Sequence, residues 1–181
     1  MTETLSPKQL VKEAQHAYKT GAYLKAALGY EAAAESYQSN GSHLEAAEML
    51  NNSSVAYIQA GEDASALRVV DGTAEVFADA GDLRRQGMAM GNLGTALEAN
   101  GRLEDALEAY QQSAELLQQA GETSLRANVM QSLSALQLKT GHQLEALASM
   151  QSGLDGLAKP NPQQRALKKL LQMPYKFFGG S

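Results

Sequence analysis

The sequence contains no cysteine among its 181 residues, and it has fewer basic residues than acidic ones. Without cysteine the chain has neither a disulfide framework nor a thiolate metal site, which fits a reducing compartment, so we expect a cytoplasmic location. The 15 Lys and Arg against 20 Asp and Glu give a formal net charge of -5. Non-specific binding to nucleic acid depends on clustered basic residues, so no nucleic-acid partner is expected.

Long apolar runs are also absent. None approaches the roughly 20 residues that a helix needs to span a bilayer. The N-terminal segment MTETLSPKQL lacks the charged and then apolar layout of a secretion signal. The sequence therefore predicts a soluble chain.

Residue groups that support catalysis or metal binding are scarce. The three histidines, at positions 16, 43 and 142, do not form a metal-binding spacing. The acid pairs at 62–63 and 104–105 follow turn glycines, where they favour the positive end of the next helix rather than acid–base chemistry. We therefore predict no catalytic residue, no metal and no cofactor, and a protein that is not an enzyme.

What the sequence does have is a glycine period of twenty residues. The periodic positions are Gly21, Gly41, Gly61, Gly81, Gly101, Gly121 and Gly141. Glycine is favoured after a helix because it enters the left-handed conformation without a Cβ penalty. Alternate glycines sit in different contexts, so the repeat is forty residues long and consists of two antiparallel helices, called here the first and second helix.

Large and small residues alternate at helical spacing in both helices of the repeat. In the second helices the successive positions are Ala26, Ala66, Ala106 and Ala146; then Tyr30, Val70, Tyr110 and Met150; then Ala33, Thr73, Ser113 and Gly153; then Tyr37, Phe77, Leu117 and Leu157. In the first helices Leu10, Leu50, Met90 and Met130 precede Ala14, Ser54, Gly94 and Ser134 by four residues. The pattern predicts one continuous second helix per repeat, packed closely on its first helix.

The third repeat carries a family resemblance. Residues 92–117, NLGTALEANGRLEDALEAYQQSAELL, resemble a tetratricopeptide repeat, with Leu93, Gly94, Ala106 and Tyr110 on matching positions. The forty-residue period, against about 34 in the common form, is similar to the long-repeat subgroup. The segments ALGYEAAAESY and HLEAAEML are also similar to the soluble NSF attachment proteins, which are long-repeat relatives.

The resemblance implies an all-α fold, a right-handed α–α superhelix of four hairpins followed by a capping helix. We expect the array to occupy 1–158, with repeats at about 7–41, 42–81, 82–121 and 122–158, and a capping helix and tail at 159–181. Such arrays bind a protein or peptide in the concave groove lined by their first helices. The resemblance therefore specifies the fold better than it specifies the function.

The family register projects a set of mostly uncharged residues onto that groove. They are Lys8, Lys12, Gln15, Asn51, Asn52, Val55, Gln59, Met88, Asn92, Thr95, Asn128, Gln131 and Ala135. Side-chain amides both donate and accept, so they can pair with the backbone of an extended peptide. No Lys or Arg occurs from Ala26 to Leu67, which favours a neutral or mildly basic segment. The alternative is that these amides only solvate the surface.

The chain after Asp155 differs in composition from the array. It has five basic residues and no acid, whereas the preceding part has ten bases and twenty acids. We expect a capping helix from about Gln163 to Gln172, with Leu167, Leu170 and Leu171 against the last hairpin and Lys168 in solvent. The predicted tail contacts are Tyr175, Lys176, Phe177 and Phe178. This tail could cap the array, occupy its groove, or contact a partner or membrane surface.

Two functions from different classes follow. The first is a protein-protein interaction scaffold or adaptor that binds a partner segment in the concave groove. The alternative is a membrane-peripheral assembly or trafficking factor that docks through the basic aromatic tail. In either case we expect a monomer or weak homodimer with a protein partner.

Overall fold

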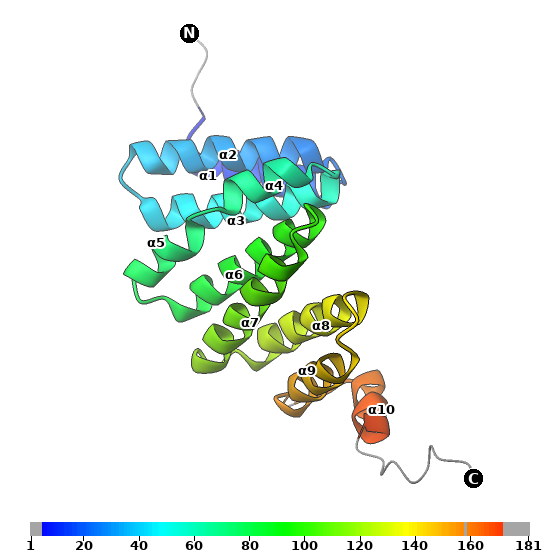
Figure 1. Ribbon diagram of the computed structural model, residues 1–181. Helices are drawn as coiled ribbons and strands as arrows, with labels where there is room; N and C mark the ends of the chain where they lie inside the picture. Colours follow the sequence, from blue (N-terminus) through cyan, green and yellow to red (C-terminus); the bar gives the residue numbers. More distant parts are fainter. Residues whose placement is uncertain (1–4, 158, 172–181) are drawn as a thin grey trace, which may run out of the picture.

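The computed structural model describes residues 5–157 and 159–171, and within them the chain forms ten α-helices (Figure 1). These are α1 (Pro7–Lys19), α2 (Tyr23–Ser39), α3 (His43–Ala60), α4 (Asp63–Val70), α5 (Thr73–Asp79), α6 (Leu83–Ala99), α7 (Leu103–Gln119), α8 (Thr123–Lys139), α9 (Gln143–Asp155) and α10 (Pro162–Leu171).

Helices consecutive in sequence pack against one another as antiparallel hairpins (Figure 1). The first helices of the four repeats are α1, α3, α6 and α8, and the second helices are α2, α4 with α5, α7 and α9. Contacts between α3 and α6, and between α4 and α6, join the second repeat to the third. The predicted fold class, an all-α superhelix of helical hairpins, is confirmed.

The periodic glycines end the helices as predicted. All seven have a positive φ, between 69° at Gly81 and 85° at Gly141. The amide that follows each glycine donates to a carbonyl five residues earlier, as in the bond of 3.0 Å from Arg102 N to Leu97 O. This is the hydrogen bond of a Schellman motif, in which the left-handed residue lets the chain reverse. The repeated turn sets the length of each helix.

The second helix of the second repeat is not continuous, and the prediction of one helix there is wrong. It is divided into α4 and α5 at Asp71 and Gly72, which have ψ 133° and φ 75°. An Asp-Gly pair favours a turn because glycine adopts the left-handed conformation. Thr73 Oγ1 donates to Val70 O at 2.7 Å across the break. Both Val70 and Thr73 remain buried, so the inward-facing pattern survives.

Small residues allow the helices of a hairpin to approach closely. Ala26, Ala66 and Ala106 are fully buried. A Cβ built on Gly94 would lie 2.7 Å from Tyr110 Cδ1, which is well inside contact distance. Gly94 is therefore required for the Tyr110 ring to pack across the first helix, as the large-on-small pattern predicts.

The two ends of the array are capped differently. At the N-terminus Ser6 is the N-cap of α1 and forms a capping box with Gln9, and Pro7 is the first helical residue. At the C-terminus α10 begins at Pro162, and Asn161 exchanges bonds of 2.9 and 2.8 Å with Gln164 in the same way. The predicted capping helix is thus present, starting one residue earlier than expected.

The expected orientation of α10 is partly wrong. Leu167 and Leu171 are half-buried, but Leu170 is 49% exposed. Lys168 is not free in solvent, because its Nζ lies 2.8 Å from Asp155 Oδ1 at the end of α9. The Lys168 side of α10 therefore faces α9, and Leu170, about 200° further around the helix, points away from it.

Candidate functional site

A depression of about 190 Å³ lies between α3 and α6, the first helices of the second and third repeats. Its lining residues are Ser54, Val55, Ile58 and Gln59 from α3, with Asn92 and Thr95 from α6. Four predicted groove residues, Val55, Gln59, Asn92 and Thr95, are therefore brought together from neighbouring repeats. All six lining residues are uncharged.

An amide pair fixes one wall of this depression. Asn92 Nδ2 donates to Asn51 Oδ1 at 3.1 Å, and Asn51 Nδ2 donates to Ala47 O at 3.0 Å. Asn51 is buried, so its predicted place on the groove surface is wrong. One residue of a helix corresponds to a rotation of about 100°. Asn51 therefore points into the packing between the helices, whereas Asn52 is half-exposed.

A tyrosine fixes the position of Thr95. Tyr110 OH donates to Thr95 Oγ1 at 3.2 Å and to Glu98 Oε2 at 3.3 Å. Thr95 Oγ1 in turn donates to Gly91 O at 3.1 Å within α6. Burial raises the pKa of Tyr110 above its usual value, and the charge of Glu98 raises it further. The phenol is thus a neutral donor that orders the α6 side of the site.

The only carboxylate in this hydrogen-bonded group of described residues, Glu98, is matched by a base. Lys139 Nζ lies 3.5 Å from Glu98 Oε1, so an ion pair joins α8 to α6. Because the lining is uncharged and the nearby carboxylate is paired, the depression favours an uncharged segment of a ligand over a strongly charged one.

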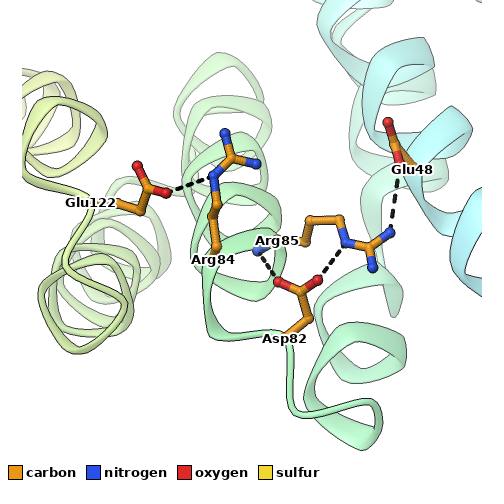
Figure 2. Close-up of polar contacts among 5 residues, drawn as sticks. All are labelled: Glu48, Asp82, Arg84, Arg85 and Glu122. Carbon is orange, nitrogen blue, oxygen red and sulfur yellow. Dashed lines mark hydrogen bonds and ion pairs between the residues drawn. The ribbon is translucent and has the colours of Figure 1, made fainter.

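Sequence reasoning missed a group of ion pairs at the start of α6 (Figure 2). Arg84 Nε lies 2.8 Å from Glu122 Oε1, and Arg85 Nη1 lies 3.6 Å from Glu48 Oε2. These pairs connect the third repeat to the fourth and to the second. The partners are 38 and 37 residues apart, close to one repeat, and that spacing was a signal available in the sequence.

Asp82 completes this group (Figure 2). Its Oδ1 accepts from the Arg85 amide at 2.9 Å, and its Oδ2 lies 2.6 Å from Arg85 Nε. The backbone hydrogen bond, and then the guanidinium, hold the pKa of Asp82 below its usual value. Arg85 also stacks over the Phe77 ring, 5.1 Å from its centroid. These contacts fix the start of α6, the helix that carries Asn92 and Thr95.

The remaining predicted groove residues lie elsewhere. Lys12 lines a crevice of about 700 Å³ between α1 and α2. Asn128 and Gln131 line a cavity of about 280 Å³ where α8 and α9 meet α10. Gln15 is exposed but does not line either space. The predicted groove residues that line a space are thus divided among three separate spaces along the array.

Three further expectations bear on the site. Tyr175, Lys176, Phe177 and Phe178 lie outside the described residues. Among the residues that are described, no cluster of three or more His, Cys, Asp or Glu could hold a metal ion. In the same part of the chain, no helix combines the length and the apolar character needed to cross a membrane.

The geometry first defines a class of protein: a tandem array of helical hairpins with an exposed depression between its first helices. Residues 6–152 match the family described as soluble NSF attachment protein, SNAP. The chain belongs to this family, which has tetratricopeptide-like repeats but is distinct from the tetratricopeptide family itself. A comparison with curated proteins gave no match.

Membership of this family bears on two predictions. Members are non-enzymatic adaptors, which confirms that the protein is not an enzyme. They act through contacts with other proteins, which agrees with the predicted kind of partner. The similarity noted for the segments around Tyr30 and Ala46 pointed to the correct family, although the third repeat resembles a tetratricopeptide more closely.

Proposed function

We propose that this protein is an adaptor in NSF-dependent trafficking, and that it holds an uncharged segment of a partner protein along its first helices between α3 and α6. The depression lined by Val55, Gln59, Asn92 and Thr95 is the observation that carries this proposal. The family name makes NSF the first protein to test for attachment.

The chemistry of the depression suits a peptide backbone. Asn92 Nδ2 donates to Asn51, but the side-chain oxygen of Asn92 can still accept a hydrogen bond. The Gln59 amide is exposed to solvent. Val55 and Ile58 add apolar surface beside these amides. A segment bound here would exchange backbone hydrogen bonds with the amides and bury one or two small side chains.

The rigidity of the walls supports the same proposal. The Asn51–Asn92 pair, the Tyr110–Thr95 bond and the ion pairs at Arg84 and Arg85 fix α6 relative to its neighbours. A preorganised surface loses less conformational entropy on binding than a mobile one. The adaptor therefore presents a fixed platform to its partner.

The test compares two lysine substitutions at the same position of the repeat. Val55→Lys fills the depression with a charged side chain. Ala135→Lys places the same side chain on the exposed face of α8, at a predicted groove position that does not line this depression. Wild-type and variant proteins are immobilised, and binding of NSF and of other captured proteins is measured. We expect Ala135→Lys to bind the partner as the wild type does. The affinity of Val55→Lys for the same partner should be at least about tenfold weaker, which corresponds to about 1.4 kcal/mol.

Equal retention by both variants would contradict the groove proposal, and absence of NSF binding by all three proteins would contradict the NSF-dependent role. Asn92→Ala is a poorer variant, because it also leaves the buried Asn51 oxygen without its donor.

A further inference from the structure

Three exposed leucines lie at the turn between α8 and α9. Leu138 is 50% exposed, Leu144 is 74% exposed and Leu147 is 44% exposed. Leu138 is the next-to-last residue of α8, and Leu144 and Leu147 are in the first turn and a half of α9. They form an apolar patch, called here the terminal leucine patch.

The repeat register explains the apolar character of two of these positions, Leu138 and Leu147. Eighty residues earlier, Ile58 and Leu67 occupy the positions of Leu138 and Leu147. Ile58 lines the depression beside α6, and Leu67 packs against the cluster that contains Leu97 of α6. Both positions thus face the first helix of the following repeat. At the end of the array no further repeat follows within the described residues, and the equivalent leucines stay exposed.

The helix α10 covers only part of this end. Its Leu167 lines the cavity with Gly153, Leu154 and Leu157, which belong to the end of α9 or follow it. The helix has 10 residues, against 17 in α6, or about 15 Å against about 25 Å. Among the described residues, none gives equivalent cover to the start of α9, where Leu144 and Leu147 lie.

The same chain continues beyond α10 with a segment of suitable length and composition. Residues 173–178 are Met-Pro-Tyr-Lys-Phe-Phe. The seven residues from 172 to 178 span up to about 23 Å when extended, more than the roughly 20 Å length of the thirteen-residue α9. Lys168 of α10 pairs with Asp155, so the segment starts near the end of α9, and its span exceeds the roughly 12 Å along the helix from Asp155 to Leu147. Its Lys176 is opposite in charge to Glu145, which lies between two leucines of the patch in sequence.

We infer that residues 173–178 fold back onto the terminal leucine patch and supply the apolar cover that a further repeat supplies in the interior. Tyr175, Phe177 and Phe178 bury the leucines, and tethering through α10 gives the segment a high effective concentration. The inference concerns the end of the array and does not depend on the function proposed for the α3–α6 depression.

The absence of tryptophan from the chain allows a direct test. The full chain carrying Phe178→Trp contains a single tryptophan. We expect its emission to lie at shorter wavelength, and its quenching by acrylamide to be weaker, than in a free peptide of residues 170–181 with the same substitution. Both properties are expected to stay constant with protein concentration.

A second pair of substitutions locates the contact. Leu144→Gln with Leu147→Gln removes the apolar surface without adding charge, and it should make the tryptophan as accessible as in the peptide. The matched control is Leu24→Gln with Leu28→Gln on α2, two leucines that are 47% and 55% exposed at the other end of the array. The control should leave the emission unchanged, and far-ultraviolet circular dichroism should show the same helix content in all variants.

Several results would overturn the inference. Emission equal to that of the free peptide would show that the tail is not docked, and so would a blue shift that appears only with anionic vesicles. A shift that grows with protein concentration would assign the patch to a second copy. A shift that survives the Leu144 and Leu147 substitutions would place the tail on another surface.

Discussion

The interior of the array around α6 and its C-terminal end around α9 are built on the same repeat but are held by different contacts. In the interior, α6 is tied to the repeats on both sides by Arg84 and Arg85. At the end, α10 is joined to α9 by the Lys168–Asp155 pair and the half-buried Leu167. Ile58 is half-buried in the interior, whereas its counterpart Leu138 is 50% exposed.

The difference shows that position in the array, and not only residue type, decides what a repeat can do. A repeat with neighbours on both sides has rigid walls and can present a shaped surface, as α3 and α6 do. A terminal repeat retains the apolar residues of the pattern without the helix that would bury them. Interior repeats therefore offer a preorganised site, whereas at the C-terminal end the described residues leave an apolar face exposed.

The largest expected effect is on stability, and it compares a packed glycine of the interior with a glycine at the C-terminal end. Gly94→Ala places a Cβ 2.7 Å from the rigid Tyr110 ring, and we expect it to lower the free energy of unfolding by roughly 2–3 kcal/mol. Gly156→Ala, after α9, meets Arg126 Nη1 at 3.4 Å and should change it by less than about 0.5 kcal/mol. Urea denaturation measures both; equal losses would show that the two regions are packed alike.

The next effect concerns the junction of the first two repeats. Tyr57 OH donates to Glu31, which also pairs with Arg68 at 3.0 Å. Tyr57→Phe should lower the free energy of unfolding by about 1–2 kcal/mol near neutral pH, because the charged Glu31 acceptor loses its donor. Tyr23→Phe, on the half-exposed Tyr23 ring, is the control.

The same tyrosine predicts a pH dependence. Burial and the Glu31 hydrogen bond raise the pKa of Tyr57 from 10.0 to about 12. The folded-state pKa is above that of the unfolded chain, so this stabilisation is complete below pH 10 and is lost as pH rises toward 12. Thermal unfolding of the wild type should weaken across that window more steeply than that of Tyr57→Phe. Parallel curves would rule out this role of the phenol.

A smaller effect compares the two helix caps. Asp82→Ala removes the side chain that accepts from the Arg85 amide, and it should cost about 1 kcal/mol of global stability. The equivalent change at α10, Asn161→Ala, removes a bond of 2.9 Å to the Gln164 amide. Because α10 contains no fully buried residue, we expect faster amide exchange within α10 and almost no change in the urea midpoint.

The smallest expected effect is at the surface of the C-terminal end. Lys168→Met removes the ion pair with Asp155, whose partners are 32% and 45% exposed. Such a pair contributes about 0.5 kcal/mol or less and is screened by salt. The difference from wild type should disappear at high ionic strength, as followed by thermal unfolding. A difference that persists would indicate that Lys168 also supports the packing of α10.

Much of the fold could be predicted from the glycine period, because the φ > 0 turn is a local requirement that glycine meets alone. The break between α4 and α5 was not predicted, although the Asp71-Gly72 pair is a turn signal. The regular spacing of Val70, Thr73 and Phe77 obscured it, since these residues keep the inward pattern across the break.

The site was less accessible to sequence reasoning. Val55, Asn92 and Thr95 could be placed by repeat register, but the burial of Asn51 depends on a rotation of one residue, which the register does not resolve. Long-range pairs such as Arg85 with Glu48 depend on how one repeat is rotated against the next. That rotation results from side-chain packing across the interface, so no single repeat encodes it.

We propose that the interior junction of α3 and α6, and not the end of the array, contacts the partner. A photo-crosslinking residue placed at Gln59 in the depression, or at the exposed Gln151 on α9, tests it with the partner captured by the wild-type protein. The account predicts a covalent adduct from position 59 and none from position 151. An adduct from position 151 alone would contradict it.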